Sequence, residues 1–415
     1  MAAGTRAAAA KDHTELVLKI ATALALSGHG EAVARMTGMA RAFRADAPLW
    51  AVHKGYRGPR GRTALQYAAW AGDAARVRFL VELGPGEATA LMLASERGHL
   101  DAVRCLVEQG GATMDAAGVA LNLAAQNGHY RVVSYLAGHA CAGACEALAL
   151  AACAQGRLGL VRCLAEWGGV DVMSADGSTA LMVASEKGFL EIVHFLVEHG
   201  GAAVDSARAS DGRTALLWAC EKGHLDIVRC LVEQGGADVN LARADGSTAL
   251  MDASEKGCLG IVRCLVEQGG ADVDSARASD GQTALLWACE KGHLDIVRCL
   301  VERGGAAVNP ARRSDGQTAL LWACENGHLD IARCLVQGGV DVNLARAADG
   351  RTPLMCAAAC GHLLSGESYP TVSVALVCLL LQHGADMRSL DVAGRKAFDF
   401  AKSFPFASHV RGLLE

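Results

Sequence analysis

The chain repeats one block of sequence at a nearly constant interval between Ser174 and Leu354. One threonine of the block recurs at spacings of 35, 34, 35, 35 and 34 residues, at Thr179, Thr214, Thr248, Thr283, Thr318 and Thr352. Such a period is typical of stacked supersecondary units, each of which packs only on its neighbours. The 415 residues therefore predict an array of units and not one large core.

Each copy of the block predicts two helices and an extended segment. Residues 225–233 confine their charges to one narrow stripe, so the remaining apolar surface must be covered on both flanks. A shorter helix at 215–222 follows Thr214, which can cap it. The pair Gly235–Gly236 is expected to supply the left-handed geometry that ends the second helix. The turn-rich segment 237–246 predicts a projecting β-hairpin finger.

The recurring pattern resembles the ankyrin repeat over roughly residues 60 to 400. It runs Gly-x-Thr-Ala/Pro-Leu-x-x-Ala, then Gly-His-Leu-x-Ile-Val, then Leu-Val-x-x-Gly-Gly-Ala-Asp-Val-Asn. Pro353 keeps the family's proline, whereas Leu217, Leu286 and Leu321 replace its usual histidine, and the double glycine lengthens each unit by a residue. The resemblance implies an all-α dominated solenoid of stacked helix-turn-helix repeats with projecting β-hairpin fingers. It also implies a concave groove lined by the first helices.

Changes in the pattern predict four segments. We expect an N-terminal helical cap at 1–58, degenerate repeats with short fingers at 59–172, regular repeats at 173–360, and a repeat with a loop insertion and a C-terminal cap at 361–415. The insertion, at 364–373, is expected to be an exposed loop.

Charge and apolar runs exclude several functional classes. Lys plus Arg is 39 against 44 for Asp plus Glu, so the net charge of −5 favours neither nucleic acid nor an anionic membrane as a partner. The longest strongly apolar run, 372–381, is too short to span a bilayer, and residues 1–13 lack the pattern of a signal peptide. We expect a cytoplasmic monomer, with the nucleus as an alternative location.

The cysteines and histidines of the chain recur with the repeat. Seven of the 16 cysteines share one helical position and are expected to be buried thiols, not disulfides: Cys105, Cys163, Cys230, Cys264, Cys299, Cys334 and Cys378. Histidines after the helix-breaking glycine are expected to bond to loop backbone: His99, His129, His224, His293, His328 and His362. The group His139, Cys141, Cys145 and Cys153 lacks zinc-knuckle spacing. We therefore expect no metal, cofactor or catalytic residue.

The first helices carry the strongest candidate for a binding surface. Trp218, Glu221 and Lys222 share one helical face. Stacking extends this face over Asp252, Glu255, Lys256, Trp287, Glu290, Lys291, Trp322, Glu325 and Asn326. Aromatic residues flanked by charges suit a binding hot spot. Alternatively, the tryptophans fill space between helices and the charges form a solvated rim. Asp252 interrupts the aromatic series and is expected to face solvent, because burial of an aspartate is costly.

The fingers carry a second set of candidates. Arginines are expected at the finger tips, at Arg208, Arg243, Arg277, Arg312 and Arg346. Each lies near an aspartate, at Asp211, Asp245, Asp280, Asp315 or Asp349. Salt bridges between adjacent fingers are one interpretation, and recognition of an acidic peptide is the alternative.

The leading hypothesis is a noncatalytic scaffold that binds partner proteins through the groove and finger tips, mostly at residues 205–355. The alternative rests on a faint resemblance of residues 10–50 to an F-box, through the run from Glu15 to Ile20 and the pair Leu49-Trp50, although the leading Leu-Pro is absent. On that hypothesis the chain is a substrate-recognition subunit of a cullin-type ubiquitin ligase.

Overall fold

The computed structural model describes residues 62–82, 88–111, 113–140, 142–165, 173–174, 176–360, 369–401 and 408–414. The chain forms two compact units, one of residues 1–148 and 159–169 and the other of residues 149–158 and 170–415. The F-box-like residues 10–50 and the expected N-terminal cap lie outside the described residues. None of the described helices combines the length and apolar character needed to cross a membrane.

The first part of the chain consists of helices joined by short links. They are α4 (Ala64–Ala71), α5 (Ala74–Glu82), α6 (Ala88–Arg97), α7 (Leu100–Glu108), α8 (Met114–Gln126), α9 (Tyr130–Ala137), α10 (Ala142–Ala154) and α11 (Leu158–Ala165). Between α9 and α10, for example, the chain has only residues 138–141 in which to turn. No finger of the later kind fits in such a link.

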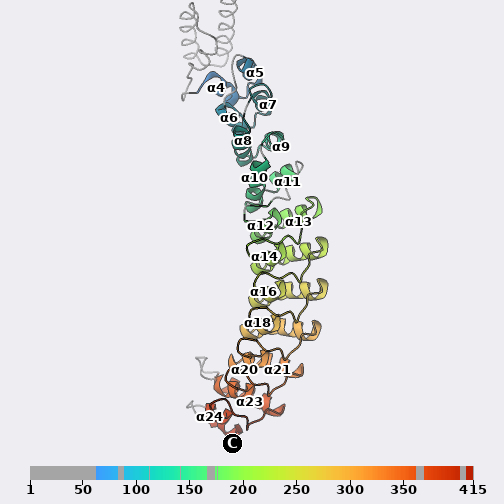
Figure 1. The fold of residues 1–415 in the computed structure, drawn as a ribbon, viewed down its shortest axis with the longest axis vertical. Helices are drawn as coiled ribbons and strands as arrows, with labels where there is room; N and C mark the ends of the chain where they lie inside the picture. Colours follow the sequence, from blue (N-terminus) through green and yellow to red (C-terminus); the bar gives the residue numbers. More distant parts are fainter. Residues whose placement is uncertain are drawn as a thin grey trace, which may run out of the picture. The chain divides into compact units, whose positions relative to one another are not determined.

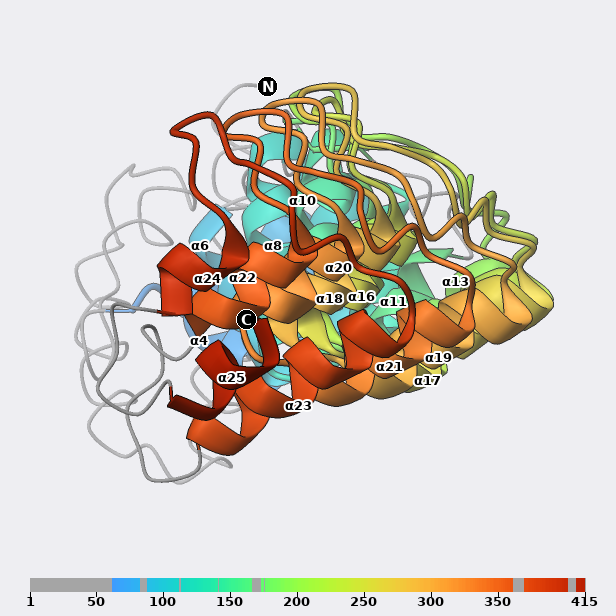
Figure 2. The same ribbon diagram turned by 90° about the horizontal axis from the view of Figure 1, so that it is seen from below.

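The second unit repeats a pair of helices and a finger. Its helices are α12 (Ala180–Lys187), α13 (Leu190–Glu198), α14 (Ala215–Lys222), α15 (Leu225–Arg229), η2 (Cys230–Gln234), α16 (Ala249–Lys256), α17 (Leu259–Arg263), η3 (Cys264–Gln268), α18 (Ala284–Lys291), α19 (Leu294–Arg298), η4 (Cys299–Arg303), α20 (Ala319–Glu325), α21 (Leu329–Gln337), α22 (Pro353–Ala359), α23 (Tyr369–Gln382), α24 (Ala397–Ala401) and α25 (Ser408–Leu414). The first helices α12, α14, α16 and α18 follow one another along the stack (Figure 1). Viewed along the stack, first helices, second helices and fingers form three layers (Figure 2).

Each first helix of the regular repeats begins at a threonine cap. The Leu217 N–H donates to Oγ1 of Thr214 at 3.3 Å, as expected. The helix ends at Gly223, whose φ of 79° is left-handed and suits glycine. The next histidine reaches back one repeat: Nε2 of His224 lies 3.3 Å from the Glu186 carbonyl oxygen, in the last turn of α12. The predicted backbone bond is confirmed here, and the acceptor is a helix end instead of a loop.

The extra residue of the regular units forms a π turn. In η2 the Gly235 N–H donates to the Cys230 carbonyl, five residues back, at 3.0 Å. The sequence of α21 lacks this residue, and there the Gly338 N–H donates to the Cys334 carbonyl, four residues back, at 3.0 Å. The predicted left-handed geometry is confirmed at Gly236, with φ of 62°. It is wrong at the preceding glycine, whose φ is −84°, because that residue closes the π turn.

The fingers are turns that hold one another through backbone bonds. The sequence predicts full β-hairpins, but the fingers form only isolated antiparallel bridges, such as that between Ala242 and Thr248. Among the described residues, no strand is longer than one of these bridges. The Ala244 N–H donates to the Asp211 carbonyl of the preceding finger at 2.9 Å. At Gly246, with φ of 85°, an added Cβ would lie 2.8 Å from the backbone nitrogen of Ala278 in the next finger. Adjacent fingers are therefore in close backbone contact.

The recurrent cysteines lie between the helices as free thiols. Burial is confirmed for five of the predicted positions, Cys105, Cys230, Cys264, Cys299 and Cys334. Cys163 and Cys378 are half-buried. In the first-helix layer, burial raises the pKa of Cys356 to about 12. Such a thiol stays protonated and packs as a small apolar side chain.

The predicted loop at 364–373 is partly wrong. Residues 369–373 form the first turns of α23, which continues to Gln382. Ser373 is buried, and its hydroxyl donates to the Ala357 carbonyl in α22 at 2.7 Å. This bond ties the start of α23 to the preceding helix. Residues 360–368 lie between the two helices, and 361–368 of these are outside the described residues.

Candidate protein-binding surface

The predicted face of α14, α16, α18 and α20, here called the first-helix strip, is graded in exposure. Trp218, Trp287 and Trp322 are half-buried, so they partly fill space between helices and partly meet solvent. The glutamates Glu221, Glu255, Glu290 and Glu325 and the terminal Asn326 are also half-buried. Lys222, Lys256 and Lys291 are exposed. The outermost groups of the strip are therefore amines.

Each tryptophan of the strip lies beneath a finger arginine. The guanidinium carbon of Arg277 is 5.5 Å from the centre of the Trp287 ring, and that of Arg312 is 5.4 Å from Trp322. Arg208 is 5.1 Å from Trp218. These are cation–π distances. The arginine heads thus lie against the first helices and do not project from the finger tips as predicted.

The finger aspartates fix these arginines. Nε of Arg277 donates to Asp280 Oδ1 at 2.9 Å, and its Nη2 donates to Oδ2. The same two-bond pairing joins Arg208 to Asp211, Arg312 to Asp315 and Arg346 to Asp349. The arginine hydrogen bonds hold the pKa of Asp280 below its usual range. Most of these salt bridges lie within a finger, so the predicted pairing between fingers is wrong except for Arg208 with Asp176 at 3.9 Å.

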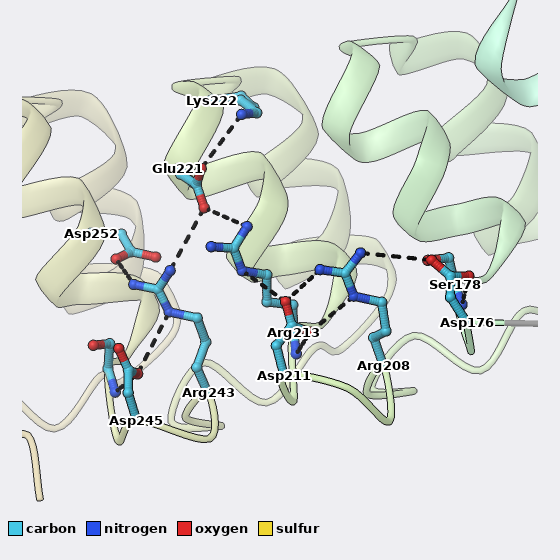
Figure 3. A network of polar contacts seen from close by, with 11 residues as sticks. Asp176, Ser178, Arg208, Asp211, Arg213, Glu221, Lys222, Arg243, Asp245 and Asp252 are labelled. Atoms are coloured by element: carbon cyan, nitrogen blue, oxygen red, sulfur yellow. Dashed lines mark hydrogen bonds and ion pairs between the residues drawn. The ribbon is translucent and has the colours of Figure 1, made fainter.

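Three glutamates of the strip, Glu221, Glu290 and Glu325, are bonded to side chains of the fingers. Oε2 of Glu221 lies 2.9 Å from Nη1 of Arg213 and 3.6 Å from Nη1 of Arg243 (Figure 3). In the later repeats glutamine takes over this role: Nε2 of Gln317 donates to Glu325 at 3.0 Å. Arg346 adds an ion pair with Glu325 at 3.3 Å. One oxygen of these carboxylates is therefore already bonded inside the protein.

Asp252 is buried, contrary to the prediction that it faces solvent. It is 4% exposed and forms an ion pair with Arg243 (Figure 3). Burial raises its pKa to about 6, although the nearby Arg243 acts in the opposite direction. Its second oxygen, Oδ2, is buried without a hydrogen-bond partner. The ion pair supplies the compensation that made burial of this carboxylate possible.

Cation–π contacts of one tryptophan in each unit were not predicted from the sequence. Arg213 lies 4.3 Å from the Trp218 ring centre, closer than the finger arginine. In the first unit, Trp70 has Arg62 at 5.1 Å and Arg97 at 5.0 Å from its ring centre. Alignment of Thr63 with the regular threonines would have placed this segment on the same helical face.

The histidine and cysteine group considered for zinc has other bonds. Nδ1 of His139 lies 2.9 Å from the Tyr135 carbonyl oxygen, and Sγ of Cys145 donates to the Ala137 carbonyl at 3.6 Å. Within the described ranges, no group of three or more His, Cys, Asp or Glu side chains is placed to hold a metal ion. Cys141 is outside those ranges.

Comparison with known proteins gives matches along most of the chain. The family model described as "Ankyrin repeats (3 copies)" matches residues 7–115, 84–147, 148–243, 235–312 and 304–391, and the first of these matches includes the F-box-like segment. The crystal structure of the ankyrin repeat domain of Bcl-3, described as a unique member of the IkappaB protein family, is similar at 27% identity, with a TM-score of 0.47. That match covers 57% of this chain and 100% of the other. No curated protein matches the chain.

Proposed function

The chain belongs to the ankyrin repeat family, whose repeat is a general protein–protein interaction module, and from this premise we propose a noncatalytic scaffold that holds partner proteins against the first-helix strip. The observation that carries the proposal is the row of half-buried indoles, each with a cation over its ring, at Trp218, Trp287 and Trp322. Tryptophan and arginine are the residues most enriched in binding hot spots. Residues 205–355 supply most of this surface.

The salt bridges of the fingers support the proposal because they preorganise the strip. Arg277 and Arg312 are each held at two nitrogen atoms by an aspartate of their own finger. Ordering of a flexible side chain at an interface costs about 0.5–1.5 kcal/mol, and a chain that is already ordered avoids that loss on binding. The indole faces and guanidinium planes are thus presented in fixed positions to a partner.

The proposal is tested by affinity purification of the tagged full-length chain with quantitative mass spectrometry. In a variant with Trp218→Ala, Trp287→Ala and Trp322→Ala, we expect specific partners to fall at least about 10-fold, since hot-spot truncations cost about 2 kcal/mol or more each. Circular dichroism checks that the variant is folded.

A matched control changes Arg229, Arg263 and Arg298 to alanine. These exposed residues end α15, α17 and α19, the second helices of the same stretch of repeats. We expect this control to keep the partners. A folded tryptophan variant that keeps an unchanged partner set would refute the strip as the binding surface.

A further inference from the structure

The exposed cations of the strip are lysines, and they belong to a regular row that also includes the last residue of α12. The first helices α12, α14, α16 and α18 all end in lysine, at Lys187, Lys222, Lys256 and Lys291. All four are exposed. The row stops at α20, where the half-buried Asn326 follows the helix. Four consecutive repeats therefore offer an ammonium group at the same structural position.

The arginines beside this row are not free to bind an acidic partner. Their Nε and Nη2 atoms bond to the finger aspartates, and the side chains of Arg277 and Arg312 are only 23% exposed. A partner carboxylate would have to displace a two-bond pair to gain the same contact. The alternative of acidic-peptide recognition by the finger arginines is therefore disfavoured, and lysine becomes the available cation.

The lysines can exchange partners without leaving a glutamate unsatisfied. Lys291 Nζ lies 3.3 Å from Glu290 Oε1, and Lys222 Nζ lies 3.4 Å from Glu221 Oε1. Each pair joins residues that are adjacent in sequence, and the lysine side chains are 40% exposed. Exposed ion pairs of this kind contribute little to the stability of the folded chain. The other oxygen of each glutamate is held from the finger, by Gln282 or by Arg213. An incoming carboxylate can therefore take the ammonium group at small cost.

We propose that the partner segment is an extended acidic peptide whose carboxylates bind the lysine row while its apolar side chains meet the tryptophans. Packed helices lie about 8–10 Å apart, so successive lysines should recur at about that distance. A peptide in the extended polyproline II conformation has about three residues per turn and rises about 3.1 Å per residue, so every third side chain lies on one face about 9 Å from the last. The expected partner sequence thus has an acidic residue at every third position with apolar residues between. This inference rests on the proposed function and names its partner class.

The test measures binding of a synthetic peptide to the full-length chain by fluorescence polarisation. The probe is a fluorescein-labelled 12-residue peptide of four Glu-Leu-Pro units, and the comparison peptide has the same composition with its glutamates in one block. We expect the spaced peptide to bind at least about 10-fold more tightly, and its affinity to fall with added salt because exposed charges are screened. Equal affinity of the two peptides, or no binding of either, would overturn the inference.

The variants separate the lysine row from bulk charge. Lys222→Glu, Lys256→Glu and Lys291→Glu together should weaken binding of the spaced peptide at least about 10-fold, as expected for the loss of several charge pairs. A control variant makes the same change of charge on the second helices, through Arg229→Glu, Arg263→Glu and Arg298→Glu. We expect its affinity for the spaced peptide to be nearly unchanged. Equal weakening by both sets would mean that only net charge matters and would overturn the inference.

Purification of cellular partners distinguishes the two proposals. If the lysine variant keeps its partners while the tryptophan variant loses them, the strip binds proteins and the acidic-peptide inference fails. If both variants keep all partners, both proposals fail. Loss of the same partners in both folded variants supports both.

Discussion

In two neighbouring repeats, the arginines at the equivalent finger position bind different partners. In the repeat of Trp287, Arg277 pairs with Asp280, three residues on, and lies over the indole. In the preceding repeat the finger is one residue shorter, and Arg243 forms an ion pair with Asp252 at the position of the tryptophan. A one-residue difference in a turn, together with one substitution on a helix, converts an aromatic surface contact into a buried ion pair.

The shorter finger explains why the arginine changes partner. Asp245 lies two residues after Arg243, and Nε of that arginine is 3.8 Å from its Oδ1, too far for a hydrogen bond. Asp245 accepts the Ser247 N–H at 2.9 Å, as Asp280 accepts the Gln282 N–H at 3.1 Å, but it does not also accept a hydrogen bond from its arginine. The guanidinium is left to turn inward, where Asp252 and Glu221 both offer oxygen atoms. The repeats that carry a tryptophan therefore hold a partly exposed ion pair, and the repeat that carries Asp252 holds a nearly buried one.

The largest difference between the two repeats is expected in stability, when the arginine of each pair is removed. Arg243→Ala leaves the carboxylate of Asp252 buried without its main partner, and we expect a loss of about 3–5 kcal/mol in the free energy of unfolding at neutral pH. Arg277→Ala is the matched control and should cost less than about 1 kcal/mol, because Asp280 stays partly exposed. Urea unfolding followed by circular dichroism measures both. Equal losses in the two variants would show that burial does not distinguish the pairs.

The two aspartates should also respond to pH with opposite sign. The pKa of Asp252 is raised to about 6, so its stabilising contribution is present below the unfolded pKa of about 3.9 and is lost as pH rises through 6. Relative to the natural chain, Asp252→Asn should therefore gain about 2–3 kcal/mol between pH 4 and pH 7.

The control for the pH experiment is Asp280→Asn. The pKa of Asp280 is lowered by its arginine, so the natural chain gains stability from this pair above the unfolded pKa and loses it as pH falls through the folded value. The control should thus lose stability relative to the natural chain as pH rises from acid. The same pH dependence in both variants would contradict the assigned pKa directions.

The smallest effect is expected from a second one-residue comparison. The sequence of α21 lacks the residue that makes the π turn in η3, yet Gly338 still closes the helix end. Deletion of Gln268 should convert η3 to the α21 form at a cost below about 1 kcal/mol, because backbone bonds are exchanged and not lost. Thermal unfolding tests this, with deletion of the buried Leu265 as a strongly destabilising control. A comparable loss in both deletions would show that the π turn is required.

The repeat and its capping residues could be predicted because they depend on local chemistry. Thr214 must precede the free amide groups of its helix, and Gly223 must take a left-handed conformation to end it. The candidate strip could also be located, because spacings of three and four residues place side chains on one helical face. The strength of its charge interactions could not be predicted, because the arginines that contact the strip come from the fingers and not from the same helix.

The sequence by itself determined the period, the two-helix unit, the turn positions and the face on which the tryptophans recur, since each follows from short-range spacing along the chain. Only the tertiary structure decided that Asp252 is buried, that the finger arginines lie over indoles, and that lysine is the exposed cation of the strip. These properties depend on how closely one repeat approaches the next, and that distance sets burial, and with it the strength of each charge interaction.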